Sequence, residues 1–318
     1  MKKQLPLLAN LLAQFLFGIG TLFTRMGMSV VDQNSVKLLS FRFCVGAVVL
    51  SLLVLLHIKK VHYGTGPIWM IFLCGLFNPL ISQVLEATST TYAPVSQIHM
   101  YNSLLPIAMI VASALINREY PTKKQFFFAW VTVAGVFIAR MADRSATGMT
   151  PIGMALIVAG IVVVSVQRAL VRRTTGSFGS FEIVYLTTIM GAVAFSAVSF
   201  GSHVASGAAP LAFFEPLRHT PFVVSILYLG IGAACVAFLL MTYASANLPY
   251  AVYSSTCTFS TVVGILAGVL ILHETFQIQE VIGTAVILAG VVGVSFSYDK
   301  NDREGNRYSK RPAKPAQG

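Results

Sequence analysis

Residues 221–243 read PFVVSILYLGIGAACVAFLLMTY, a stretch of 23 residues that contains no charge. About 20 apolar residues are enough for a helix to cross the hydrocarbon core of a bilayer. Nine other segments have the same character, and charged residues or Gly and Pro separate them. The ten predicted spans are residues 5–24, 35–57, 67–88, 93–117, 124–142, 151–171, 181–202, 221–243, 248–272 and 279–297. The sequence therefore predicts an all-α polytopic membrane protein with ten transmembrane helices.

The composition of the whole chain agrees with this interpretation. Of the 318 residues, 56% are hydrophobic and 10% are charged, whereas soluble domains carry about 25% charged residues. These values exclude a disordered chain, a nucleic-acid module and an ordinary cytosolic enzyme. We attribute the net charge of +11 to membrane topology and to attraction by anionic lipids, so we expect membrane lipid as a partner and no nucleic acid.

The distribution of Lys and Arg predicts the orientation. With the N-terminus in the cytoplasm, fifteen Lys and Arg residues lie in inner segments and five in outer segments, as the positive-inside rule requires. Both termini then lie in the cytoplasm, which an even number of spans allows. We expect a multi-pass protein of the plasma (cytoplasmic) membrane, with residues 299–318 as a disordered basic cytoplasmic tail.

The chain contains an internal repeat with an offset of 155 residues. Three features recur in register, namely Pro94 with Pro249, Glu119 with Glu274, and Gly135 with Gly290. We predict a first five-helix repeat over residues 1–147 and a second over 148–298. Because five is odd, the second repeat must be inverted in the membrane. Inverted repeats around a central cavity are typical of secondary transporters that work by alternating access.

These residues resemble a known family, the EamA-type branch of the drug/metabolite transporter superfamily. The resemblance depends on Pro106, on Arg42 within the second span, and on the recurring Glu and Gly residues of the repeat. It implies a carrier, since members transport metabolites such as amino acids and related branches transport nucleotide sugars or cationic drugs. Two features depart from the pattern: Thr261 replaces the proline in the second repeat, and the loop from about 203 to 220 is long.

Three ionisable residues lie within predicted spans at similar depth. Arg42, Glu86 and His99 fall in the outer half of the membrane, where a charged group is costly unless it is paired or faces water. They are candidates for a substrate and proton site, with Arg42 holding a carboxylate and Glu86 or His99 changing protonation. The alternative is a structural ion pair or snorkelling side chains, with His99 as a core residue. We expect Arg168, near the inner end of its span, to snorkel.

Polar side chains form stripes at helical spacing on spans 1, 3, 4 and 9. The further candidates for substrate binding are Asn10, Gln14, Asn78, Asn102, Tyr253 and Ser254. Four such faces predict one shared cavity, with spans 5 and 10 outside it. The alternative is that these groups bond neighbouring helices, as polar side chains in membranes commonly do.

Several features predict hinges and packing. Pro79 and Pro106 interrupt backbone hydrogen bonding near mid-membrane, which allows hinges in spans 3 and 4. The pair Gly264 and Gly268 favours close helix packing within the fold, although such a face would also allow two chains to pair as a homodimer. We expect Glu119 and Glu274, at span ends, to bond adjacent helix starts or to pair with loop cations.

The absence of motifs narrows the function further. The sequence contains no P-loop, no H-E-x-x-H and no C-x-x-C, so we expect no cofactor, no metal and no enzymatic activity. We predict a secondary active transporter of a small metabolite, an amino acid or related compound, with export by proton exchange. The alternatives are a flippase for a lipid or lipid-linked sugar, an intramembrane enzyme, and a scaffold that does not transport.

Overall fold

The computed structural model describes residues 5–57, 66–117, 123–139, 149–207, 209–248, 253–254, 256–274 and 277–296. Within this part of the chain the fold is helical, and no strand is present. Seven helices are long and apolar enough to cross a membrane. These are α1 (Leu5–Val30), α2 (Ser35–Leu55), α3-η1-α4 (Trp69–Tyr92), α5-α6 (Val95–Asn117), α9 (Pro151–Thr174), α10 (Ser180–Ala205) and α11-η3-α12 (Thr220–Asn247).

Three further helices correspond to predicted spans 5, 9 and 10. They are α7 (Lys123–Ala139), α14 (Phe259–Ile271) and α15 (Ile278–Phe296), and their apolar segments cover 10–17 residues. The all-helical fold class is confirmed, whereas the number of ten spans stays a prediction. Glu119 and the predicted tail at 299–318 lie outside the described residues.

Local sequence explains where individual helices begin. The side chain of Asn34 accepts a hydrogen bond from the backbone N–H of Lys37 at 3.0 Å and so caps α2. Thr150 accepts from the N–H of Gly153 at 3.0 Å, and Pro151 follows at the start of α9. Both arrangements satisfy backbone groups that the first turn of a helix leaves without partners.

The predicted end of the first span was wrong. The prediction stopped at residue 24 because Arg25 resembles a boundary charge, but α1 continues to Val30. Arg25 stays helical and forms an ion pair with Glu274, so its charge has a partner within the protein.

The long loop before the eighth span contains the 3-10 helix η2 (Pro210–Arg218). Its Phe213 is buried and stacks on Phe41 of α2, with ring centroids 5.1 Å apart. Phe222 of α11 contacts the same ring edge-on at 5.4 Å. The loop is therefore held against the largest apolar cluster of the protein, which includes these three aromatic residues.

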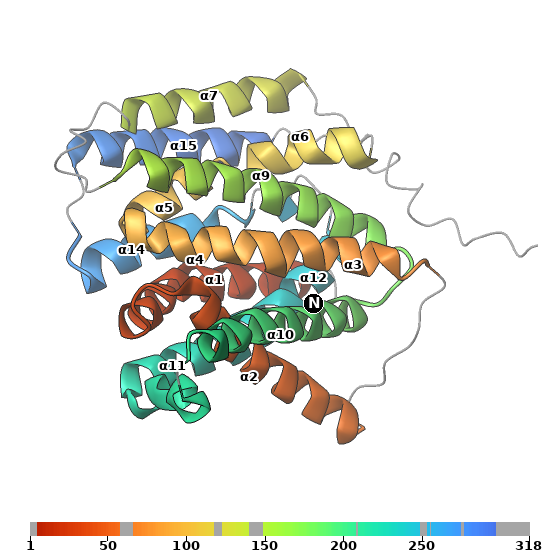
Figure 1. Ribbon diagram of the computed structural model, residues 1–318. Helices are drawn as coiled ribbons and strands as arrows, with labels where there is room; N and C mark the ends of the chain where they lie inside the picture. Colours follow the sequence, from red (N-terminus) through yellow and green to blue (C-terminus); the bar gives the residue numbers. More distant parts are fainter. Residues whose placement is uncertain are drawn as a thin grey trace, which may run out of the picture.

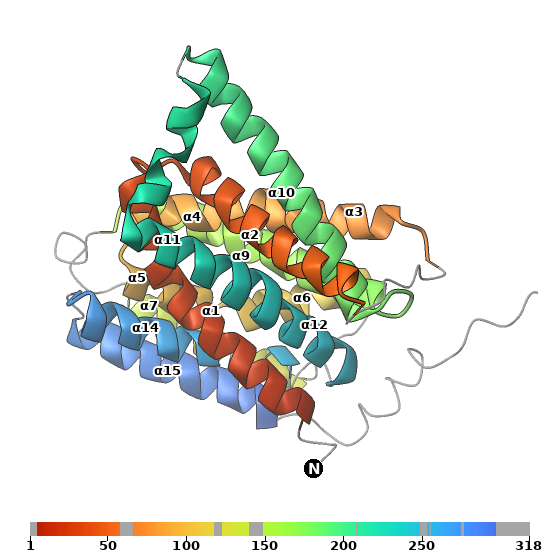
Figure 2. The same ribbon diagram turned by 90° about the horizontal axis from the view of Figure 1, so that it is seen from below.

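The helices pack in pairs that join the two predicted repeats. α7 packs on α15 at one side of the bundle, and α2 packs on α10 toward the opposite side (Figures 1 and 2). α1 contacts α14, and the corresponding helix of the second half, α9, contacts α6. In the α7–α15 pair, a Cβ on Gly135 would lie 2.7 Å from the backbone nitrogen of Ile287, which explains a small residue at that position. The fifth and the second helices therefore each pair with their own counterparts, and the first helix of either half pairs with the fourth helix of the other, as a two-fold relation between the halves requires.

The third helix of each half is irregular near its middle. Residues Leu76–Ile81 (η1) form a π-helix in which Asn78 has φ −147° and ψ 117°, outside the helical region. Residues Tyr228–Ala237 (η3) form a longer π-helix at the corresponding place in the second half. Such segments free backbone groups and are frequent at functional sites.

The fourth helix of each half is also broken. α5 (Val95–Asn102) ends before a turn at Ser103, and α6 begins at Leu105 (to Asn117). Pro106 occupies the first turn of α6, where proline is tolerated. In the second half a turn at Cys257 and Thr258 precedes α14. Because that half has Thr261 in place of the proline, the break does not depend on proline.

Candidate functional site: a central cavity

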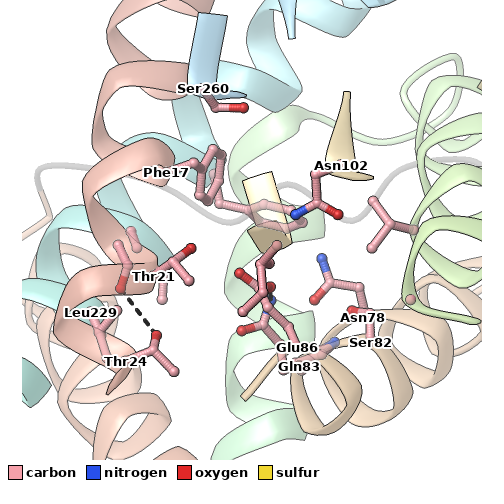
Figure 3. A pocket seen from close by; sticks show the side chains of 18 of the residues that line it. Phe17, Thr21, Thr24, Asn78, Ser82, Gln83, Glu86, Asn102, Leu229 and Ser260 are labelled. Carbon is pink, nitrogen blue, oxygen red and sulfur yellow. Dashed lines mark hydrogen bonds between the residues drawn. The ribbon is translucent and has the colours of Figure 1, made fainter. Parts of the chain in front are cut away.

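A cavity of about 140 Å³ lies between the two halves. Its lining comes from α1, α2, η1-α4, α5-α6, α9, α10, η3-α12 and α14, and none of the described lining residues comes from α7 or α15. Side chains of α1, such as Phe17 and Thr21, face Asn78 and Asn102 across this space (Figure 3). The cavity is therefore shared by both halves, and the two helices expected outside it do lie outside.

Most of the candidate residues line this cavity. The lining includes Gln14, Arg42, Asn78, Pro79, Glu86, His99 and Asn102. Spans 1, 3, 4 and 9 contribute as expected, the last of them through Ser260. The structure brings these residues together from five different helices, although they are spread over the first third of the sequence and its last fifth.

Arg42 and Glu86 do not form the direct ion pair that was one alternative. The guanidinium Nη1 of Arg42 donates to Oε1 of Gln83 at 2.5 Å, and Gln83 Nε2 is 3.5 Å from Glu86 Oε2. Gln83 therefore stands between the two charges. Arg42 also lies over the ring of Phe43, 5.4 Å from its centroid. Its Nε is buried without a hydrogen-bond partner.

His99 is a buried histidine whose two ring nitrogens, Nδ1 and Nε2, make no hydrogen bond of regular geometry, although the backbone of Gly18 interacts with the ring. Its ring lies against Gly264 of α14, where a Cβ would be 2.0 Å from His99 Cδ2. A Cβ on Gly268 would lie 2.6 Å from Glu274 Oε2. The two glycines therefore let α14 approach α5 closely, and the expectation that they serve packing within the fold is confirmed.

Three candidates and one predicted hinge lie outside the cavity lining. The side-chain amide of Asn10 donates to the carbonyl of Tyr253 at 3.3 Å and to Thr256 Oγ1 at 2.5 Å. Tyr253 and Ser254 are buried, and Tyr253 belongs to an apolar cluster with Ala13 and Met109. These polar groups join α1 to the segment before α14, which is the interhelical bonding that the alternative predicted. Pro106 is buried nearby in α6.

The interpretation of Arg168 as a snorkelling residue was wrong. Arg168 of α9 lines the cavity, and its Nη1 donates to the thiol of Cys257 at 2.8 Å. Position near a span end suggested snorkelling, but the side chain turns inward because the opposing helix offers a polar partner. Only tertiary packing reveals such a partner.

Other lining residues were also missed. Gln83 lies next to the Asn78, Ser82 and Glu86 stripe on the same helix, and Thr187 and Thr188 are buried cavity residues of α10. An adjacent pair of threonines near the middle of a mostly apolar span was the available signal for α10. No comparable signal marked Gln83 as the group that links Arg42 to Glu86.

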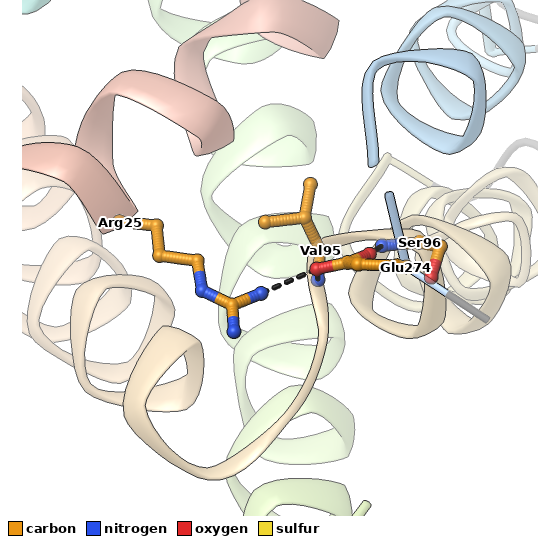
Figure 4. A network of polar contacts seen from close by, with 4 residues as sticks. All are labelled: Arg25, Val95, Ser96 and Glu274. Carbon is orange, nitrogen blue, oxygen red and sulfur yellow. Dashed lines mark hydrogen bonds and ion pairs between the residues drawn. The ribbon is translucent and has the colours of Figure 1, made fainter. Parts of the chain in front are cut away.

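A separate polar network closes one end of the bundle. The carboxylate of Glu274 accepts hydrogen bonds from the backbone N–H groups of Val95 and Ser96, each at 2.8 Å, and pairs with Arg25 (Figure 4). It therefore caps the start of α5, where a negative charge is favourable. The expectation that Glu274 bonds an adjacent helix start and a cation is confirmed.

A multi-pass helical bundle in which two related halves share a cavity is the architecture of many membrane transporters. Comparison with known proteins identifies the family. The profile of the EamA-like transporter family matches residues 4–141 and 147–296, and the chain belongs to this family.

Individual relatives agree with this assignment. The chain is 26% identical over 312 residues to the "Uncharacterized transporter YcxC" of Bacillus subtilis (strain 168), and the match covers 97% of this chain and 96% of the relative. A solved structure titled "Crystal structure of protein" has the same fold, with a TM-score of 0.66 and 18% identity. That match covers 91% of this chain and 96% of the solved one.

Proposed function

We propose that this protein is a secondary active transporter that moves a small metabolite, an amino acid or related compound, by alternating access of its two halves. The direction we propose is export, coupled to proton exchange. Energy from an ion gradient is in keeping with a sequence that contains no P-loop.

The observation that carries this proposal is the cavity between the halves with its unpaired polar atoms. Buried polar atoms in proteins nearly always have hydrogen-bond partners. Here the Nε of Arg42 and the Oγ of Ser82 are buried without a partner among protein atoms, the ring nitrogens of His99 make no hydrogen bond of regular geometry although the Gly18 backbone interacts with the ring, and all three residues line the cavity. These atoms have almost no surface exposed to the cavity, so a polar solute would become their partner once movement of the two halves exposes them, as alternating access requires.

Proton coupling is supported by the two titratable groups of the cavity, Glu86 and His99. Histidine changes its charge near neutral pH when it is unperturbed, and a carboxylate inside a membrane protein is a common proton carrier. Pro79 lies in the irregular segment η1, and Pro106 follows the break before α6. We propose both segments as hinges, since irregular helices need less hydrogen-bond rearrangement to bend.

The cavity size favours a small solute over a lipid-linked one. A cavity of about 150 Å³ can hold a molecule the size of benzene, and the volume here is about 140 Å³. A lipid-linked sugar is much larger and would need an opening toward the bilayer. The flippase alternative therefore ranks second.

The membrane arrangement is part of the proposal. We propose the plasma (cytoplasmic) membrane with both termini in the cytoplasm, from the excess of Lys and Arg in the inner segments. Large apolar side chains such as Phe126, Phe127 and Trp130 of α7 are exposed and suit contact with lipid. Measurement of the oligomeric state would test whether two chains pair through such a face as a homodimer.

Uptake into proteoliposomes tests the function directly. Purified protein would be reconstituted and supplied with pooled labelled amino acids, with and without an imposed pH gradient. We expect saturable uptake that rises with the gradient and is lost in Arg42→Ala and Glu86→Gln. Arg218→Gln, which removes an exposed arginine of η2, is the matched control and should behave as wild type. If no pool is taken up under either condition, the amino-acid proposal is contradicted. If both cavity variants still take up solute, Arg42 and Glu86 have structural roles only.

A further inference from the structure

The charged residues of the cavity do not balance. Among the described lining residues, three carry a formal charge: Arg42, Glu86 and Arg168. Arg42 comes from α2 of the first half, Arg168 from α9 of the second half, and Glu86 from α4 between them. Two cations and one anion leave a surplus of one positive charge. Protonation of His99 or of Glu86 would increase this surplus.

Nearby carboxylates do not supply the missing negative charge. Glu274 accepts from the backbone of Val95 and Ser96 and pairs with Arg25, so its charge is used at the end of the bundle. Arg172, one turn beyond Arg168, donates to the carbonyl oxygens of Ser245 and Leu248 at 3.2 and 3.3 Å. These two bonds hold Arg172 at the end of α12, and Arg172 does not belong to the cavity lining.

The two arginines act on the same space from opposite halves. Both guanidinium groups influence the Glu86 carboxylate electrostatically. Arg42 reaches it through Gln83, whereas Arg168 bonds neutral groups: its Nη1 donates to the thiol of Cys257 at 2.8 Å, and it also hydrogen-bonds the Tyr253 side chain. A thiol is a weak acceptor, and a carboxylate forms stronger, charge-assisted bonds with a guanidinium group. A solute carboxylate would therefore be a better partner for this donor than the thiol is.

We propose that the cavity selects solutes with a net negative charge, carboxylates such as acidic amino acids, and that Arg168 is the residue that sets this selectivity. An uncompensated charge within a protein is unfavourable. An anionic solute would neutralise the surplus, a neutral solute would leave it, and a cationic solute would increase it. This inference rests on the proposed transport function and deepens it by naming the substrate class.

Matched pairs of solutes test the selectivity. The labelled probes are glutamate with glutamine and aspartate with asparagine, since the members of each pair have nearly equal size and differ by one charge, and lysine serves as the cation. In proteoliposomes of the wild type we expect kcat/KM for the acidic member to exceed that for its amide by about tenfold or more, as loss of a close charge pair commonly costs. Lysine should compete weakly.

Variants assign the effect to Arg168. Arg168→Gln should bring the acid-to-amide ratio to near one, and Arg168→Lys, which keeps the charge, should retain most of the preference. Arg173→Gln removes an exposed cation from the same helix and should leave the ratio unchanged. A second measurement, the rise in melting temperature of detergent-solubilised wild type on adding glutamate or glutamine, gives the preference without any variant.

The outcomes separate the two proposals. Transport or binding that prefers amides or lysine in the wild type overturns this inference and leaves the transporter proposal intact. An acid preference that survives in a folded Arg168→Gln variant overturns the role of Arg168. Failure to transport or bind any of these solutes overturns this inference, and the proposed function falls with it only if the pooled amino acids also show no uptake.

Discussion

Two polar clusters join the halves of this protein, and they use their polar groups differently. At the end of the bundle, both carboxylate oxygens of Glu274 accept hydrogen bonds from a helix start, and Arg25 pairs with the same group. In the cavity, the Nε of Arg42 has no partner, and neither nitrogen of His99 makes a hydrogen bond of regular geometry. The first cluster resembles a structural clamp, whereas the second resembles a site that awaits a ligand. The contrast predicts that substitutions in the first lower stability and substitutions in the second lower transport.

The largest loss of stability is expected for Glu274→Ala. It leaves the N–H groups of Val95 and Ser96 without their acceptor and removes the partner of Arg25. Hydrogen bonds to a charged group contribute about 1.5–3 kcal/mol each, so we expect a loss of about 3 kcal/mol, measured as a lower melting temperature in detergent. Glu215→Ala, which removes an exposed carboxylate of η2, is the control. Equal melting temperatures for the two variants would contradict the structural clamp.

Gly264→Ala is expected to disturb the contact between α14 and the ring of His99 on α5, which lies between the two clusters. The added Cβ would lie 2.0 Å from His99 Cδ2, so the ring or α14 must shift, at a cost of about 1–3 kcal/mol for overpacking. Transport should fall as well, because His99 lines the cavity. Gly201→Ala is the matched control, since a Cβ there has no neighbour within 4 Å and helix propensity improves. Melting curves and uptake that match those of the control would show that the close approach is unimportant.

Arg25→Gln should have a small effect on stability. Its side chain is 42% exposed, and exposed ion pairs contribute about 0–1 kcal/mol. The backbone bonds to Glu274 remain in this variant. Comparison of its melting temperature with that of Glu274→Ala separates the ion pair from the helix cap. A loss as large as that of Glu274→Ala would mean that the ion pair, rather than the cap, holds this end together.

The smallest change in stability is expected for His99→Leu. The substitution removes two buried nitrogens that make no hydrogen bond of regular geometry, and with them an interaction with the Gly18 backbone, and it keeps an apolar group against Gly264. The cost of an unsatisfied polar group disappears, so the melting temperature should be nearly unchanged while uptake falls strongly. Normal uptake with a sharply lower melting temperature would reverse the assignment and make His99 a structural residue.

The sequence predicted much of the fold because hydrophobic length and charge placement are local properties. Apolar runs such as 221–243 predicted helices at the right places, and the recurring Glu274 predicted a bond to a helix start. Helix ends were less secure: Arg25 suggested a boundary at 24, but α1 continues to Val30 and Arg25 pairs with Glu274. A charge marks the end of a span only when it has no partner within the protein.

The cavity was predicted in part. Helical spacing identified Gln14, Asn78 and Asn102 because residues three or four apart share a face. The same spacing selected Asn10 and Tyr253, which bond each other outside the lining. Periodicity specifies a face, whereas the neighbouring helix decides whether that face meets a cavity or another side chain.

The sequence alone therefore determined that this chain is a multi-pass helical membrane protein with an internal repeat and a few ionisable groups within its spans. Only the tertiary structure decided how those groups are partnered. It inserted Gln83 between Arg42 and Glu86 and turned Arg168 toward Cys257. The physical reason is that hydrophobicity acts residue by residue along the chain, whereas hydrogen bonds and charge pairs depend on atoms that come together only when distant helices pack.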